Sequence, residues 1–264
     1  MQVQLLVIDP QVDFCDPSGA LSVAGADQDM ARLSQMVHRL APRLDRIHVT
    51  LDSHHLVDIA HPIFWQDERG SHPAPFTIIS ADDVEAGRWT AAQPEARQRA
   101  VAYVQALARH GRYPLCLWPP HCLIGSRGHA VLPVLFDALQ DWERHYAVVD
   151  YVQKGSNIYT EHYSAIQADV PDPADPSTQV NTALVESLKQ ADILAVAGEA
   201  GSHCVANTVR DLASQFGDDR LLSKIVLLRD AVSPVAGFEA FEDSFLSEMT
   251  ARGMKLSTTA EFLA

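Results

Sequence analysis

Five short, nearly continuous apolar runs are the feature that most constrains how this chain can fold. Strands that are covered on both faces lose the alternation of polar and apolar residues, so such runs predict buried parallel strands. The predicted strands cover residues 3–9, 46–51, 145–151, 191–197 and 223–229, with a short final strand near Lys255. Helices are predicted at residues 28–40, 96–110, 181–190, 204–216 and 238–252. This alternation predicts an α/β fold of three layers (αβα), with a mostly parallel central sheet and helices on both faces.

The length of 264 residues suits one large α/β domain, and we interpret residues 1–264 as a single domain. An insertion at about residues 63–117 interrupts the alternation of strands and helices. It has one predicted helix and a proline-rich flank, so we expect it to form a lid or an oligomer contact. Residues 168–178 (ADVPDPADPST) are rich in proline and aspartate and predict an exposed loop.

Charge and cysteine usage exclude several classes of function. The formal net charge is −14, which repels phosphate backbones and anionic lipid headgroups, so neither nucleic acid nor a membrane is expected as a partner. The four cysteines (Cys15, Cys116, Cys122 and Cys204) form no CxxC pair, and a chain of this length needs no disulfide staples. No signal peptide and no apolar stretch of about 20 residues is present. We therefore expect a cytoplasmic protein with reduced thiols.

Reactive side chains stand at the ends of four predicted strands. Asp9 ends the first strand, Asp52 follows the second, Lys154 follows the third, and Cys204 follows the fourth and opens a helix. Right-handed crossovers place the C-terminal ends of parallel strands on the same edge of the sheet. We therefore expect these four side chains to meet in one site.

The position of Cys204 alone leaves two interpretations open. A helix N-terminus stabilises a thiolate, and free backbone N–H groups in the same turn can hold an oxyanion, which favours a nucleophile. An inert buried cysteine is the alternative. If Cys204 is a nucleophile, Asp9 can act as its general base and Lys154 can hold negative charge on either group. The alternatives for these two residues are a loop-capping aspartate and a solvated lysine.

A second group of residues suits a divalent metal ion. Asp52 and His54 form a DxH pair, and residues two apart in an extended segment point the same way. His121, with His61 as a further candidate, would complete a set of one carboxylate and two or three imidazoles. Such a set suits zinc, with iron or manganese as alternatives.

The metal interpretation has its own alternatives. A DxH pair by itself is a weak signal, because histidine-rich loops are often only solvated. His55 alternates to the other face of the segment and is expected to be a bystander. His72, in GSHPAP, is a substitute ligand that ranks below His121.

Five segments together resemble the nicotinamidases and the wider family of isochorismatase-like cysteine hydrolases. The opening VIDPQVDFCDPSGALSVAGA is similar to the first motif of that family, and TLDSHH is similar to its metal motif. The remaining three are WPPHCLIGSRG, QKGSNIYTEHYSAI and GEAGSHCV, which follow in the order that the family shows. The resemblance spans nearly the whole chain, and this joint occurrence favours Cys204 as a nucleophile.

The resemblance implies a catalytic triad of Asp9, Lys154 and Cys204. It also implies an oxyanion hole made of two backbone N–H groups, which map to Ala200 and Cys204. A cis peptide bond is then expected at Glu199–Ala200. The implied reaction releases ammonia from a small amide through a thioester, with conversion of nicotinamide to nicotinate as the first expectation.

The same resemblance implies the surroundings of the substrate. Asp52, His54 and His121 correspond to ligands of a divalent metal ion. Phe14 and Trp118 correspond to aromatic walls that stack on a substrate ring. Members of the family are usually oligomeric, so a homo-oligomer is expected, with a small-molecule amide as the only other partner.

Three positions in the nucleophile turn depart from the family pattern. Glu199 replaces a β-branched apolar residue, Gly201 replaces a common threonine, and Ser202 replaces an acidic residue. We expect Glu199 to be either a substrate contact or a hydrogen-bonded structural group. The departures keep other substrates open, namely carbamoyl, ureido or maleamate-type amides. Further alternatives are a metal-centred hydrolase with Cys204 as a bystander and a scaffold without activity. A vinyl-ether hydrolase of the isochorismatase type is a third alternative, and the presence of Cys204 argues against it.

Overall fold

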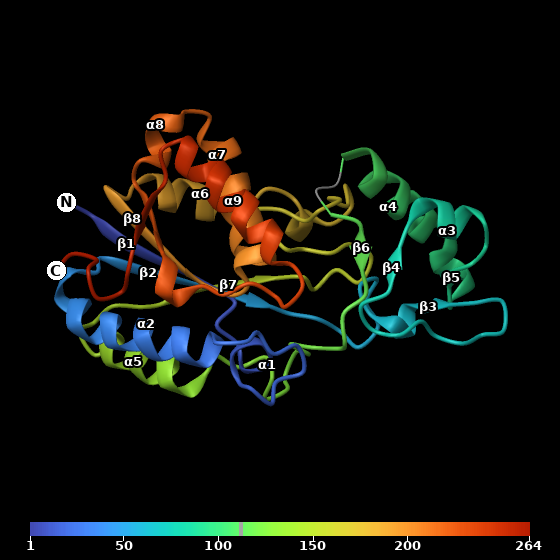
Figure 1. Ribbon diagram of the computed structural model, residues 1–264, viewed down its shortest axis with the longest axis horizontal. Helices are drawn as coiled ribbons and strands as arrows, with labels where there is room; N and C mark the ends of the chain where they lie inside the picture. Colours follow the sequence, from blue (N-terminus) through green and yellow to red (C-terminus); the bar gives the residue numbers. More distant parts are fainter. Residues whose placement is uncertain (111–112) are drawn as a thin grey trace.

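A six-stranded parallel sheet forms the centre of the computed structural model, which describes residues 1–110 and 113–264 (Figure 1). Its strands lie in the order β10-β9-β8-β1-β2-β7, and every neighbouring pair is parallel. The bounds are β1 (Val3–Ile8), β2 (Arg46–Asp52), β7 (Asp150–Lys154), β8 (Ile193–Gly198), β9 (Ile225–Leu228) and β10 (Lys255–Ser257). Strand β1 is buried along its whole length, as its continuous apolar sequence predicts.

Helices cover both faces of this sheet (Figure 1). One face carries α2 (Ala26–Leu40) and α5 (Pro133–Glu143), and the other carries α6 (Thr182–Lys189), α7 (Ala206–Phe216), α8 (Asp219–Leu222) and α9 (Glu239–Ala251). The predicted three-layer α/β fold is confirmed. Local chemistry sets several of the helix ends: Asn181 caps α6 by accepting from the N–H of Leu184, and Gly217 ends α7 in the left-handed region at φ 65°.

Two of the predicted elements were wrong in their bounds, and helix α5 was missed, as were three shorter helices at Val12–Cys15, Ala81–Glu85 and Asp219–Leu222. The third strand was predicted at residues 145–151, but β7 begins only at Asp150, because α5 runs to Glu143 and a turn with Tyr146 at φ 61° follows it. As an edge strand, β7 takes its register from β2 alone, which pairs Asp52 with Lys154. The helix predicted from Cys204 begins at Ala206, since residues Gly201–Val205 form a π-helical turn. Helix α5 was not predicted.

The segment 63–117 forms a lobe at one end of the molecule, beyond the sheet (Figure 1). Within the described residues it contains two antiparallel pairs of short strands, β3 (Trp65–Gln66) with β5 (Thr90–Ala91) and β4 (Ile78–Ile79) with β6 (Leu115–Cys116). The helices α3 (Ala81–Glu85) and α4 (Arg97–His110) pack on each other there. Residues 111 and 112 of the predicted insertion lie outside the described residues, and its role as lid or oligomer contact stays a prediction.

The short helix α1 (Val12–Cys15) follows β1 and lies beside the end of the sheet (Figure 1). Asp13 in this helix accepts from the N–H of Cys122 at 2.7 Å and of Ala20 at 3.2 Å, so it ties two loops together. None of the described helices is both long enough and apolar enough to cross a bilayer.

Candidate active site

The four reactive side chains expected at one edge of the sheet do lie together. Asp9 directly follows β1, Asp52 and Lys154 end the adjacent strands β2 and β7, and Cys204 lies in the π-helical turn after β8. The Lys154 ammonium nitrogen lies 2.9 Å from Asp9 Oδ2, 3.0 Å from Asp52 Oδ1 and 3.7 Å from Cys204 Sγ. The parallel topology therefore gathers a thiol, two carboxylates and one cation from four strands.

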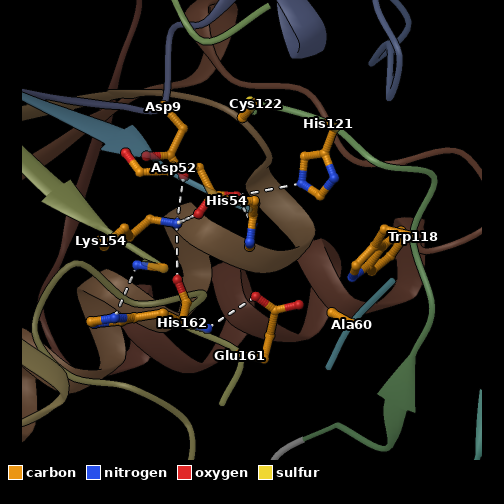
Figure 2. Close-up of polar contacts among 12 residues, drawn as sticks. Asp9, Asp52, His54, Ala60, Trp118, His121, Cys122, Lys154, Glu161 and His162 are labelled. Atoms are coloured by element: carbon orange, nitrogen blue, oxygen red, sulfur yellow. Dashed lines mark hydrogen bonds and ion pairs between the residues drawn. The ribbon is translucent and has the colours of Figure 1, made fainter. Parts of the chain in front are cut away.

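Lys154 is the centre of this cluster (Figure 2). It is buried, and besides the two carboxylates its ammonium donates to the carbonyl of His162 at 2.9 Å. Burial alone would lower the pKa of Lys154, but the charges of Asp52 and Asp9 outweigh it and raise that pKa well above its ordinary value. The next residue, Gly155, has φ 86°, and a Cβ there would lie 2.9 Å from Asp52 Oδ1, so glycine is required where the chain turns.

The pKa values of Asp9 and Cys204 are both raised. Burial raises the pKa of Asp9, and the charge of Lys154 offsets this only in part. Burial also raises the pKa of the Cys204 thiol well above its usual range, with Lys154 opposing and Asp9 adding to the shift. The Asp9 side chain lies close enough to the Cys204 thiol to raise its pKa directly. The thiol therefore keeps its proton in the free protein, next to a carboxylate that can accept it.

The backbone at Asp9 helps to aim its carboxylate. Asp9 has φ 43°, a left-handed conformation that few residues other than glycine adopt. Its N–H donates to Thr50 Oγ1 at 2.9 Å, and the Thr50 hydroxyl donates in turn to Asp9 Oδ1. The second oxygen, Oδ2, is thereby directed to Lys154.

The turn before Cys204 carries the expected oxyanion donors, and the Glu199–Ala200 peptide bond is cis, as expected. Ala200 and Cys204 both line the pocket in which a substrate would sit. The N–H of Gly201 is already used, because it donates to the carbonyl of Ser233 at 2.8 Å. The donor role of Ala200 and Cys204 stays a prediction.

Glu199 does not contact this pocket, which corrects its expected place among the substrate-binding residues. It is 0% exposed and is absent from the pocket lining. Its Oε2 accepts from the N–H of Ser233 at 3.2 Å, and its carboxyl group contacts Asp29 of α2. The physical reason is that the carboxyl group of Glu199 is buried against Ser233 and Asp29 and not against the pocket. Its other expected role, as a hydrogen-bonded structural group, fits this placement.

The expected metal ligands also converge. Donor atoms of Asp52, His54 and His121 lie within 4.8 Å of one another, and all three residues are buried. Asp52 Oδ2 lies 3.0 Å from His54 Nε2 and 3.5 Å from His121 Nε2 (Figure 2). Burial would raise the pKa of Asp52, but the charges of His54 and Lys154 outweigh it and hold that pKa well below its usual range. Asp52 is therefore anionic and lies between the candidate metal ligands and Lys154.

Outer contacts orient the three imidazoles in the same way. Nδ1 of His54 faces Asp58 Oδ2 at 3.0 Å, Nδ1 of His121 faces the Pro119 carbonyl at 2.9 Å, and Nδ1 of His61 faces the Leu56 carbonyl at 3.2 Å. Each Nδ1 can donate its hydrogen to its acceptor, which leaves Nε2 free to bind a cation.

His61 supports a four-residue ligand set. Its ring centroid lies 5.2 Å from that of His54 and 5.6 Å from that of His121, and its buried Nε2 has no hydrogen-bond partner among the described residues. Burial lowers the pKa of His61 to about 4, so its imidazole is neutral and can ligate. One carboxylate and three imidazole Nε2 atoms fit a divalent ion such as zinc. His55 and His72 are exposed and lie outside this set, as their lower ranking implied.

The pocket above Cys204 is small and has aromatic walls. Its empty space, including the part open to solvent, is about 340 Å³. Phe14 and Trp118 both line it, which is where the sequence analysis expected them, and Phe14 meets His121 edge-on with ring centroids 5.2 Å apart. Tyr163 and His203 also line it, and Trp118 Nε1 donates to the Tyr163 hydroxyl at 3.0 Å. The sequence analysis missed these last two, although both lie inside the quoted motifs.

Glu161 is an acidic lining residue that was not predicted, and neither were the apolar Leu21 and Val235. Its Oε1 accepts from the N–H of His162 at 3.0 Å, whereas its buried Oε2 has no partner among the described residues (Figure 2). Burial raises the pKa of Glu161 to about 8, so it is largely protonated at neutral pH. It lies in a loop seven positions after Lys154, inside the quoted segment QKGSNIYTEHYSAI.

Solved structures of nicotinamidases and pyrazinamidases are similar to this one. The yeast nicotinamidase has a TM-score of 0.66 and 19% sequence identity over 97% of this chain and 99% of that chain. The nicotinamidase/pyrazinamidase of Acinetobacter baumanii has a TM-score of 0.64 and 22% identity over 98% and 97%. The pyrazinamidase of Pyrococcus horikoshii, solved in complex with zinc, has a TM-score of 0.58 and 21% identity over 98% and 99%. No protein-family model matches the sequence, and no curated protein matches it either.

These alignments cover nearly the full length of both partners. TM-scores of 0.58 to 0.66 show a common fold, and at identities near 20% the activity has to be argued from the site itself. This chain therefore has the fold of the nicotinamidases and pyrazinamidases.

Proposed function

We propose that this protein is a cysteine-dependent amidohydrolase that releases ammonia from a small amide, with nicotinamide as the first candidate substrate. The observation that carries the proposal is the buried Lys154 ammonium, which lies within 3.0 Å of two carboxylates and 3.7 Å from the Cys204 sulfur. A structural cysteine needs neither a buried cation nor a carboxylate beside it, whereas a thiol nucleophile uses a nearby base to remove its proton and a nearby cation to hold negative charge.

The choice of nicotinamide rests on the shape of the pocket and on the similar proteins. A single aromatic ring suits a small pocket between Phe14 and Trp118. Among the similar structures, the yeast nicotinamidase binds the inhibitor nicotinaldehyde, and a protein from L. infantum was solved in complex with nicotinate. Both compounds carry the ring of nicotinamide.

In the first step Asp9 takes the thiol proton of Cys204 as the sulfur attacks the amide carbonyl. The raised pKa of the thiol keeps the proton in place until attack, and the raised pKa of Asp9 brings the two groups closer in proton affinity. A C–S bond forms, and the negative charge on the carbonyl oxygen is held by the N–H groups of Ala200 and Cys204. Lys154 keeps Asp9 and the sulfur in contact throughout.

In the second step the C–N bond breaks, and Asp9 returns its proton to the nitrogen, which leaves as ammonia. A water molecule then attacks the thioester with Asp9 again as the base, and this releases the acid and restores the Cys204 thiol.

Asp52, His54, His121 and His61 would hold the metal ion. Zinc is the first choice, because the similar pyrazinamidase contains it, and such an ion can bind a ring nitrogen and orient the substrate. A cytoplasmic location and a homo-oligomer complete the proposal. The four cysteines are free, in keeping with a reducing compartment.

The test measures ammonia release by the zinc-loaded protein from nicotinamide and from carbamoyl, ureido and maleamate-type amides. We expect nicotinamide to be the best substrate and Cys204→Ala to abolish its turnover. Cys116→Ala is the matched control, since Cys116 is a buried free cysteine in β6 whose thiol donates to the Leu117 carbonyl. Full activity of Cys204→Ala, with loss on chelation, would instead establish the metal-centred hydrolase.

A further inference from the structure

A cluster of buried acidic side chains lies directly behind the nucleophile turn. Glu199 precedes Ala200, and its carboxyl group faces Asp29 of α2, with Glu242 of α9 close by. All three are buried, at 0%, 3% and 8% exposure. Buried carboxylates in contact repel one another strongly unless a cation or a proton separates them, so this arrangement requires an explanation.

The hydrogen bonds show where a proton is needed. Both oxygens of Asp29 already have donors: Arg32 Nη2 lies 2.5 Å from Oδ1, and the Ser233 hydroxyl donates to Oδ2 at 2.6 Å. Glu199 Oε2 accepts from the N–H of Ser233, but its buried Oε1 has no donor, and no ion pair of Glu199 occurs within residues 1–110 and 113–264. Asp29 thus holds the negative charge, with a guanidinium beside it.

We propose that Glu199 carries a proton at neutral pH, donates it in a hydrogen bond to Asp29, and so positions the nucleophile turn for catalysis. Glu199 is a positioning residue in this account, because it does not touch the pocket. The inference rests on the proposed function only in so far as the turn carries the oxyanion donors.

The contacts connect this hydrogen bond to the turn itself. Ser233 is the link: its N–H donates to Glu199, its carbonyl accepts from Gly201 at 2.8 Å, and its hydroxyl donates to Asp29. The two residues that flank Ala200 are therefore both fastened to Ser233, and Ser233 is fastened to α2. A Cβ at Gly201 would collide with the carboxylate of Glu242, so the turn is also packed tightly against α9.

The electrostatic surroundings support the proton. Burial raises the pKa of Glu199 well above its usual range, and the charge of Asp29 and then that of Glu242 raise it further. The other ionisable groups around it are Arg32, which is engaged by Asp29, and Cys15 of α1, whose pKa burial and these carboxylates also raise. Ionisation of Glu199 at alkaline pH would place a second negative charge against Asp29 and loosen the turn.

Thermal unfolding tests the proton without any need for activity. The pKa of Glu199 is raised in the folded state. The stability that protonated Glu199 contributes is therefore fully present below the unfolded-state pKa of this residue, and it is lost as pH rises through the folded-state pKa. Glu199→Gln keeps a donor for Asp29 and an acceptor for Ser233 but has no proton to lose. Its Tm should exceed that of the wild type by a margin that widens by about 3–5 °C per pH unit above the unfolded-state value. Glu68→Gln, the same substitution at an exposed position, should show no such trend.

Kinetics then test the positioning. We expect Glu199→Gln to keep kcat on the best amide substrate within about twofold at neutral pH and to retain it at alkaline pH, where the wild type declines. Glu199→Ala should lower kcat by about 10- to 100-fold with little change in KM, because the donors move and the pocket does not.

Two results would overturn the inference: a Tm margin of Glu199→Gln that stays constant with pH, or a loss of kcat in Glu199→Gln as large as in Glu199→Ala. If the wild type hydrolyses no amide at all, the proposed function fails separately, and the Tm margin still decides whether Glu199 carries the proton.

Discussion

Replacement of Lys154 by methionine is the most informative perturbation of the candidate site. Methionine has a similar length and no charge, so Lys154→Met removes the ammonium with little change in volume. The ammonium lies 2.9 Å from Asp9 Oδ2 and 3.0 Å from Asp52 Oδ1, and all three side chains are buried. Its loss would leave two carboxylates facing each other in the interior without a cation between them.

The expected loss of stability follows from that burial. Removing one partner of a buried ion pair costs about 3–5 kcal/mol, because the remaining charge is left uncompensated. In a chain of this size such a loss lowers Tm by about 6–20 °C. The deficit should shrink as pH falls, because the unpaired carboxylates can then take up protons and no longer repel each other. The same variant should lose at least about 100-fold in kcat, since Asp9 and the Cys204 sulfur lose the charge that holds them.

A second lysine supplies the control. Lys189 lies 2.9 Å from Glu186 Oε1, the same separation as in the buried pair, but its side chain is 32% exposed and its partner 67% exposed. Exposed pairs contribute about 0–1 kcal/mol, so Lys189→Met should change Tm by no more than a few degrees. Tm measured by calorimetry and kcat measured by ammonia release compare the two variants. An equal Tm loss in both would refute the argument that burial makes the Lys154 cluster costly to break.

Three further outcomes are expected. Asp58→Asn should weaken zinc binding by about 10- to 100-fold, because Asp58 orients His54, and an unchanged affinity in a zinc titration would contradict this. In the metal-free protein, Glu161→Gln should have a higher Tm than the wild type, and this difference should grow as pH rises toward about 8 and then level off. The pKa of Glu161 is raised in the folded state, so the stability that protonated Glu161 contributes to the wild type is lost across that pH range. A Tm difference that does not vary with pH would refute the raised pKa of Glu161. Gly201→Ala should lower kcat more than about tenfold, since its Cβ would collide with Glu242 and shift the turn, and a wild-type kcat would show that the turn tolerates the shift.

Much of the fold could be read from local sequence, because burial on both faces of a parallel strand removes its polar residues. That signal found β1, β2, β8 and β9 within a few residues. It failed at β7, an edge strand whose exposed residues are not uniformly apolar and whose register depends on its single neighbour, β2. It also could not place the π-helical turn at Gly201–Val205, because the packing of α9 against that turn decides its shape.

The candidate site divides in the same way. Asp9, Asp52, Lys154 and Cys204 could be named in advance because strand ends in an α/β sheet share one edge, so position along the chain already implies proximity. Asp58 and Glu161 carry no such mark. Asp58 matters because its carboxylate meets His54, and Glu161 matters because it is buried in the pocket wall with one oxygen unpartnered.

Local sequence thus accounts for the sheet, for its reactive edge and for Cys204 as the candidate nucleophile, since each depends on residue type and on order along the chain. Tertiary structure alone decided which carboxyl groups carry charge. Glu199 and Asp29 are both acidic residues in the sequence, yet Asp29 faces the guanidinium of Arg32 and Glu199 faces the carboxylate of Asp29. Protonation depends on burial and on the partner across the contact, and those partners come from segments far apart in the chain.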